Sequence, residues 1–106
     1  MSGLKERKRV TLLAGKTMNL NLRGCDVDLA ICVSELLYKI DKNDTIIIEN
    51  FDDSEYEELK IVIRGAIRSG KKVLFYVPNN EENVTGLADE LDMPVYMYDE
   101  DIEEQL

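Results

Sequence analysis

The chain has 106 residues, carries a formal net charge of −9 and contains no histidine. Its length fits one domain, and an apolar share of 44% is enough for a hydrophobic core. Without histidine the usual zinc partner and the usual general base are missing, so neither zinc binding nor Ser-His or Cys-His catalysis within this chain is expected.

No stretch of the sequence has the pattern of a membrane helix or a signal peptide. Apolar runs such as Leu29–Val33 are far shorter than the roughly 20 residues that a membrane helix needs. The basic start, Lys5 to Arg9, is not followed by the apolar segment that is typical of a signal peptide. We therefore expect a cytoplasmic protein that makes no membrane contact.

The charge is distributed unevenly, because every charged residue from Asn79 to Leu106 is acidic. This excess should repel phosphate-rich partners, so no direct nucleic-acid binding is expected. The favoured interpretation is a solvated acidic surface that ends in an acidic tail at residues 99–106. The alternative is an acidic surface that docks on a basic partner or mimics nucleic acid.

In chain order, residues 1–9 are predicted as a flexible terminus and residues 10–98 as a single α/β domain. Val10–Ala14 has the composition of a strand. Apolar and polar residues alternate over Met18–Leu22, which predicts a second, half-buried strand. The Gly15-Lys16-Thr17 link between them favours a hairpin, and the alternative is that 18–22 follows the sheet edge.

A helix is predicted next, over Asp26–Ile40, with apolar positions around most of its circumference, so it should be well buried. Both cysteines, Cys25 and Cys32, fall in or beside it, about two turns apart and too distant for a disulfide. The stretch Thr45–Asp53 then holds three consecutive β-branched isoleucines. It predicts a parallel strand buried on both faces, followed by an acidic loop.

A second helix is predicted over Glu55–Ser69. Ser54 with Glu57 has the capping-box spacing at its start, and Gly70 stands at the C′ position at its end. A buried strand over Val73–Val77 should follow.

The remaining elements are a helix near Glu81–Leu91 capped by Asn79 or Asn80, and a strand over Val95–Tyr98. Residues 101–106 form one helical turn or stay disordered. Tyr96 and Tyr98, with Met93 and Met97 nearby, are interpreted as core packing, with a dimer seam as the alternative.

The order β-β-α-β-α-β-α-β predicts an α/β fold with a mostly parallel sheet of about four or five strands and about three helices. An antiparallel first strand is left open. STAS-like and flavodoxin-like layouts both fit this order.

The carboxylates that follow the predicted strands form one candidate site. Ligands of open α/β sheets gather outside the carboxyl ends of the strands, where Glu49, Asp99 and Asp101 are placed. A Glu after one strand and an Asp-x-Asp after another is similar to the Mg²⁺-dependent site of Toprim enzymes. Asn50 stands where that family has Gly after its Glu, so no cofactor is the favoured interpretation and Mg²⁺ the alternative.

A basic stripe lies on the second predicted helix, where Lys60, Arg64 and Arg68 recur every four residues. It is interpreted first as a solvated face that pairs with nearby carboxylates, and alternatively as a docking face.

The whole layout resembles a STAS domain, the fold of anti-sigma factor antagonists. The matching pieces are the strand pair over Val10–Leu22, the buried strand that ends at Glu49, and Asp53-Ser54 at the start of the second helix. The resemblance implies a regulatory domain that binds another protein and carries a phosphorylatable serine, here Ser54. From the residues alone, an N-cap is the favoured role of Ser54.

We therefore expect a non-catalytic regulatory protein-interaction domain of unknown oligomeric state. Its partner-binding residues are predicted to be Asp52, Asp53, Ser54, Lys60, Arg64 and Arg68. The alternatives are a divalent-metal or nucleotide-binding phosphotransfer enzyme that uses Glu49, Asp99 and Asp101, and an acidic inhibitor or nucleic-acid mimic.

Overall fold

Strand β3, Thr45–Asn50, lies in the middle of a five-stranded sheet. A computed structural model describes residues 8–106, and in it the strand order is β2-β1-β3-β4-β5 with every neighbouring pair parallel. The isoleucines of β3 are completely buried because the sheet is covered on both faces. The other strands are β1 Lys8–Ala14, β2 Cys25–Ala30, β4 Lys72–Tyr76 and β5 Val95–Tyr96.

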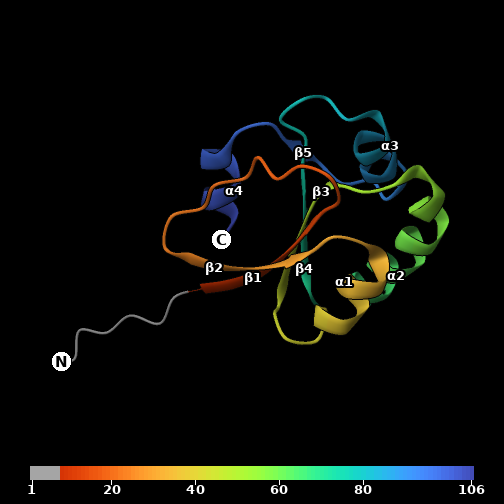
Figure 1. Ribbon diagram of the computed structural model, residues 1–106, viewed down its shortest axis with the longest axis horizontal. Helices are drawn as coiled ribbons and strands as arrows, with labels where there is room; N and C mark the ends of the chain where they lie inside the picture. The colour runs from red at the N-terminus through yellow and green to blue at the C-terminus, as the bar shows by residue number, and fades with distance from the viewer. Residues whose placement is uncertain (1–7) are drawn as a thin grey trace.

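Helices cover both faces of this sheet (Figure 1). Helices α1 (Val33–Lys39), α2 (Tyr56–Arg68) and α3 (Glu82–Glu90) pack on one face, and α4 (Asp99–Gln105) packs on the other. The first face buries Ile46 and Ile48, and the second buries Ile47 beside Ile102 of α4. These layers confirm the predicted α/β fold in one small domain.

The predicted helix over Asp26–Ile40 is wrong in its first half, because Cys25–Ala30 forms β2. Val27 and Leu29 pair with Val10 and Leu12 of β1, so they share one sheet face, while Asp26 and Asp28 point to the other. This is a period of two. It was hidden because the end of the strand and the start of α1 join in one apolar run.

The predicted hairpin is also wrong, because β1 and β2 run parallel and residues 15–24 form the crossover between them. Parallel neighbours cannot be joined by a tight turn. Leu20 of this crossover is buried against the α4 face of the sheet, whereas Met18 is exposed, so the alternation over Met18–Leu22 does not mark a strand.

The predicted caps are partly correct. Gly70 has φ +86° directly after the C-cap of α2, as predicted. The capping box is wrong, because Asp52 caps a short 3₁₀ turn, Asp53–Glu55, by accepting the Ser54 N–H at 2.9 Å. The Asn cap of α3 is wrong too, because Asn80 takes a left-handed turn conformation before the helix begins.

At the two ends of the chain, residues 1–7 of the expected flexible terminus lie outside the described residues, and Lys8 and Arg9 belong to β1. The segment expected as an acidic tail contains α4. Met93 and Tyr96 pack against the core, whereas Met97 and Tyr98 are exposed. Within residues 8–106, no helix is both long and apolar enough to cross a membrane.

Within residues 8–106, β2 is an edge strand, with β1 as its neighbour in the sheet. Its Leu29 carbonyl accepts a hydrogen bond from Lys39 Nζ on α1.

We expect Ile102→Ala to lower the free energy of unfolding by about 2–5 kcal/mol, because it empties a fully buried position between α4 and the sheet. Urea unfolding measures the loss. Gln105→Ala, on the exposed side of the same helix, is the control and should change stability little. A loss below about 0.5 kcal/mol for Ile102→Ala would mean that α4 does not pack here.

Candidate functional site at the carboxyl edge of the sheet

The strand order creates a point of divergence between β1 and β3. From the carboxyl end of β1 the chain leaves for β2 on one side, and from the end of β3 it leaves for β4 on the other. In open α/β sheets the crevice between two such diverging connections is where ligands bind.

A cleft of about 950 Å³ opens there, which we call the carboxyl-edge cleft. Its walls are the ends of four strands and the segments that follow them: residues 15–17 after β1, 31–32 after β2, 51–55 after β3 with Asn50 at the end of that strand, and 81–83 after β4. Its charged side chains are predominantly acidic. The lining contains Asp52, Asp53, Glu55, Glu81 and Glu82 against Lys16.

Asn50 fixes the loop that follows β1. Its Oδ1 accepts the Lys16 N–H at 3.1 Å and its Nδ2 donates to the Thr17 carbonyl at 2.5 Å, while its own carbonyl accepts the Gly15 N–H. A Cβ at Gly15 would stand 3.1 Å from Asn50 Oδ1, so glycine permits this close approach.

Glu49 fixes the next part of the same crossover. Its carboxylate is fully buried and accepts three bonds: from Asn19 N at 2.6 Å, from Asn19 Nδ2 at 3.0 Å and from Leu20 N at 3.1 Å. A buried carboxylate needs such donors. Glu49 is therefore an anchor for the crossover and does not face the cleft lining.

The opposite wall is held by Asn83 and Glu55. Asn83 Nδ2 donates to the Phe51 carbonyl and to Asp53 Oδ1, both at 2.9 Å, which joins the start of α3 to the loop after β3. Glu55 Oε2 accepts the Val33 N–H at 3.1 Å and so caps the first turn of α1 from another segment. The cleft is thus preorganised by bonds between its walls.

Asp52 and Glu81, two carboxylates of the lining, differ in the hydrogen bonds that they accept. Asp52 accepts from the Ser54 backbone N–H and from the Ser54 side chain, and these bonds, with a smaller contribution from the Lys16 charge, hold the pKa of Asp52 below its usual value. Glu81 Oε2 is buried and has no hydrogen-bond partner within residues 8–106. A buried acceptor without a donor is costly.

The six predicted partner-binding residues do not form one patch. Asp52, Asp53 and Ser54 line the carboxyl-edge cleft. The three basic residues lie along α2, whose 13 residues span about 20 Å, so Arg68 is at the far end of the helix from the cleft.

Lys60 is engaged within the protein. Its Nζ lies 3.1 Å from Glu57 and 3.0 Å from Glu90 of α3, and its side chain is only 18% exposed. The bond with Glu90 raises the pKa of Lys60 and lowers that of Glu90. Lys60 therefore joins α2 to α3, whereas Arg64 and Arg68 are exposed.

Two of the three carboxylates of the alternative metal site, Glu49 and Asp99, are bound to other groups of the protein. Glu49 holds the crossover, and Asp99 Oδ1 accepts the Tyr76 hydroxyl at 2.5 Å. Burial, with the bond to Asp99, raises the pKa of Tyr76. Within the part of the chain that the structure describes, no group of three or more His, Cys, Asp and Glu side chains is placed to hold a metal ion.

Sequence reasoning missed the contributions of Cys32, Glu81 and Asn83 to the cleft. The signal for Glu81 and Asn83 was their position just after a buried strand, but the strand order that brings them to β3 was not known. Cys32 was hidden by the incorrect helix. No protein-family model matches this sequence, and no curated protein or solved structure matches it either.

We expect Glu49→Gln to lower the free energy of unfolding by about 1–3 kcal/mol, because the new NH2 group must face either the Asn19 donors or the Leu20 N–H, while the remaining oxygen can accept from the other. Urea unfolding tests this. Glu104→Gln makes the same chemical change at an exposed position and should have little effect. Equal stability of both variants would remove the anchoring role of Glu49.

Proposed function

We propose that this protein is a non-catalytic regulatory domain that binds a basic segment of a protein partner in the carboxyl-edge cleft. The observation that carries the proposal is an acidic, preorganised cleft in which one carboxylate oxygen, Glu81 Oε2, lacks a donor. Rotation of the Glu81 side chain toward the cleft would let a lysine or arginine of the partner supply that donor together with the opposite charge.

The distribution of roles among the carboxylates supports binding. Glu55 and Asp53 each accept a bond that holds the walls, so these groups keep the cleft open as well as charged. Asp52, Asp53 and Glu82 are exposed and offer their negative charge to an approaching partner. Acidic walls would attract a basic segment before contact and orient it.

Regulation is proposed from two parts of the sequence resemblance to STAS domains, the buried strand that ends at Glu49 and the Asp53-Ser54 step, because the strand pair over Val10–Leu22 does not form. The strand order β2-β1-β3-β4-β5 is also one that flavodoxin-like sheets use. Ser54 is exposed at the rim of the cleft, so a kinase has access to its hydroxyl. A phosphate there would add negative charge beside Asp52, Asp53 and Glu55 and so change both the affinity for a basic segment and the stability of the loop.

The exposed part of the basic stripe, Arg64 and Arg68, is a second proposed contact for an acidic portion of the same partner. It lies outside the cleft lining. Lys60 is not included because its ammonium group already pairs with two carboxylates.

We expect the protein to bind a fluorescein-labelled oligo-arginine peptide saturably, and Asp53→Asn to weaken binding by about three- to fivefold because it removes one cleft charge while keeping the acceptor for Asn83. Fluorescence anisotropy at physiological salt measures this. Asp41→Asn removes the same charge in the turn before β3, away from the cleft, and is the matched control.

Glu81→Gln gives an independent second arm and should weaken the peptide at least as much as Asp53→Asn, because Glu81 Oε2 is the unsatisfied acceptor. If Asp41→Asn weakened peptide binding equally, the effect would be one of overall charge, and the proposal that the peptide binds in the cleft would be refuted. A rise in melting temperature with Mg²⁺ that Glu49→Gln abolishes would favour the phosphotransfer alternative instead.

A further inference from the structure

A second cleft, of about 790 Å³, opens at the amino-terminal edge of the sheet, and we call it the amino-edge cleft. It results from the strand register. Val10, Thr45 and Lys72 are neighbours across three strands, so Lys8 and Arg9 of β1 extend beyond the first paired residue of β3. The turn that leads into β3, residues 42–44, lies in the recess between this overhang and the start of β4.

The amino-edge cleft is basic although the protein is acidic. Among residues 8–106, its charged lining consists of Lys8, Arg9, Lys42 and Lys72 against the carboxylate of Asp44. These four cations come from the starts of β1 and β4 and from the turn before β3. Lys71 follows Gly70 of the cleft lining, and its ammonium group donates to the backbone carbonyl of Asn43 at 3.0 Å.

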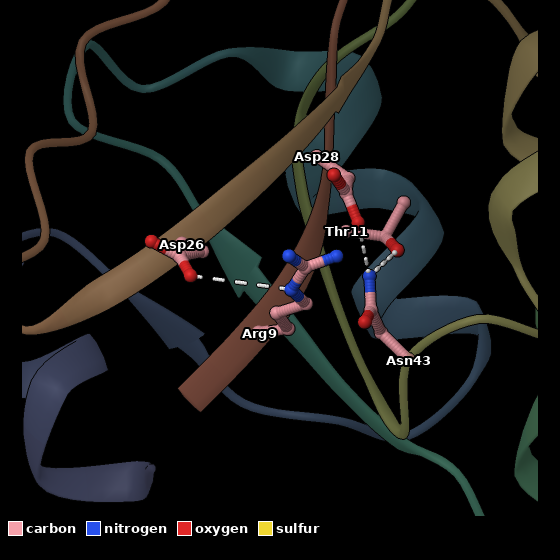
Figure 2. Close-up of polar contacts among 5 residues, drawn as sticks. All are labelled: Arg9, Thr11, Asp26, Asp28 and Asn43. Atoms are coloured by element: carbon pink, nitrogen blue, oxygen red, sulfur yellow. Dashed lines mark hydrogen bonds and ion pairs between the residues drawn. The ribbon is translucent and has the colours of Figure 1, made fainter. Parts of the chain in front are cut away.

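A buried polar network fixes the floor of this cleft (Figure 2). Asn43, only 5% exposed, donates both amide protons, to Thr11 Oγ1 at 2.9 Å and to Asp28 Oδ2 at 2.8 Å. Its carbonyl is the acceptor for Lys71. The turn that carries Lys42 is therefore held by side-chain bonds to β1, to β2 and to Lys71 just before β4, and the cationic groups stand on a rigid base.

Within residues 8–106, the cleft lining holds four cations and one carboxylate, and two further aspartates lie beside it. Asp28 points to Asn43, and Asp26 lies 3.9 Å from Arg9 Nε, which orients the guanidinium group along β1 while the Arg9 side chain stays 65% exposed (Figure 2). Both aspartates belong to β2 and lie outside the cleft lining. Lys72 donates to the Gln105 carbonyl at the end of α4, which uses one of its three protons.

We propose that the amino-edge cleft binds a small, multiply charged oxyanion of the phosphate class. A concave site with four cations on a fixed floor can bind the oxygens of linked phosphate groups. Lysine binds such oxygens as a point charge, and arginine binds them through two parallel N–H groups of its planar guanidinium. A small anion is favoured over a nucleic acid because the net charge of −9 repels an extended polyanion, whereas screening over about 8 Å lets local cations dominate inside the cleft.

The test is calorimetric titration of the whole chain with sodium tripolyphosphate, and with inorganic phosphate, at constant ionic strength. We expect saturable binding at one site, tighter for tripolyphosphate than for phosphate. Lys42→Glu should weaken tripolyphosphate by about tenfold, and Lys8→Glu should also weaken it. Lys42 and Lys8 are exposed, so both variants should keep the melting temperature of the parent.

Lys16→Glu is the matched control, because it makes the same charge change at the carboxyl edge, about 20 Å away along β1. It should change the affinity less than twofold. Equal weakening by Lys16→Glu, or no saturable heat at millimolar tripolyphosphate, overturns the proposal. Tighter binding of a short single-stranded oligonucleotide at the same ionic strength would also overturn it, in favour of a nucleic-acid surface.

Discussion

The structure depends on how a parallel strand pair is joined without a helix. β1 and β2 are parallel, so the chain must cross over a face of the sheet, and residues 15–24 do this as an irregular segment whose backbone N–H groups have no helical partners. Glu49 and Asn50, at the end of β3, supply acceptors for the N–H groups of Lys16, Asn19 and Leu20. The two residues that end the central strand thereby place β2 at the edge and β1 beside β3, and this arrangement creates the carboxyl-edge cleft.

The elements that the sequence predicted well are those with one unambiguous period. The isoleucines of β3 and the apolar face of α2 were recognised because each pattern is bounded by polar turns. β2 was missed because Leu29–Val33 joins strand, turn and helix in one apolar run, and the alternation of Met18, Leu20 and Leu22 favoured a strand where only Leu20 is buried. The acidic loop after β3 was predicted as a site. This loop lies beside Glu81 and Asn83 because of the strand order, which cannot be predicted from local sequence patterns.

The two clefts lie at opposite ends of the same central strands and have opposite charge. Parallel topology makes this separation natural, because all strands begin at one edge and end at the other. Lys39 and Arg68, in the last turns of α1 and α2, add positive charge toward the edge where the strands begin, and the partially negative helix C-termini favour cations there. Although the overall charge is −9, positive and negative charges are therefore separated between the two edges of the sheet. These edges would attract ligands of opposite sign.

Lys39 also has a consequence for how the sheet meets other chains. An edge strand presents unpaired carbonyl and N–H groups that a foreign strand can extend, and β2 is six residues long, carries the partly exposed Val27 and Leu29, and contains no proline. By donating to the Leu29 carbonyl, the Lys39 ammonium occupies an acceptor near the carboxyl end of that edge. A strand that added here would have to displace a charged donor and bury its charge. The side chain thus guards the sheet against edge-to-edge aggregation, although it belongs to a helix.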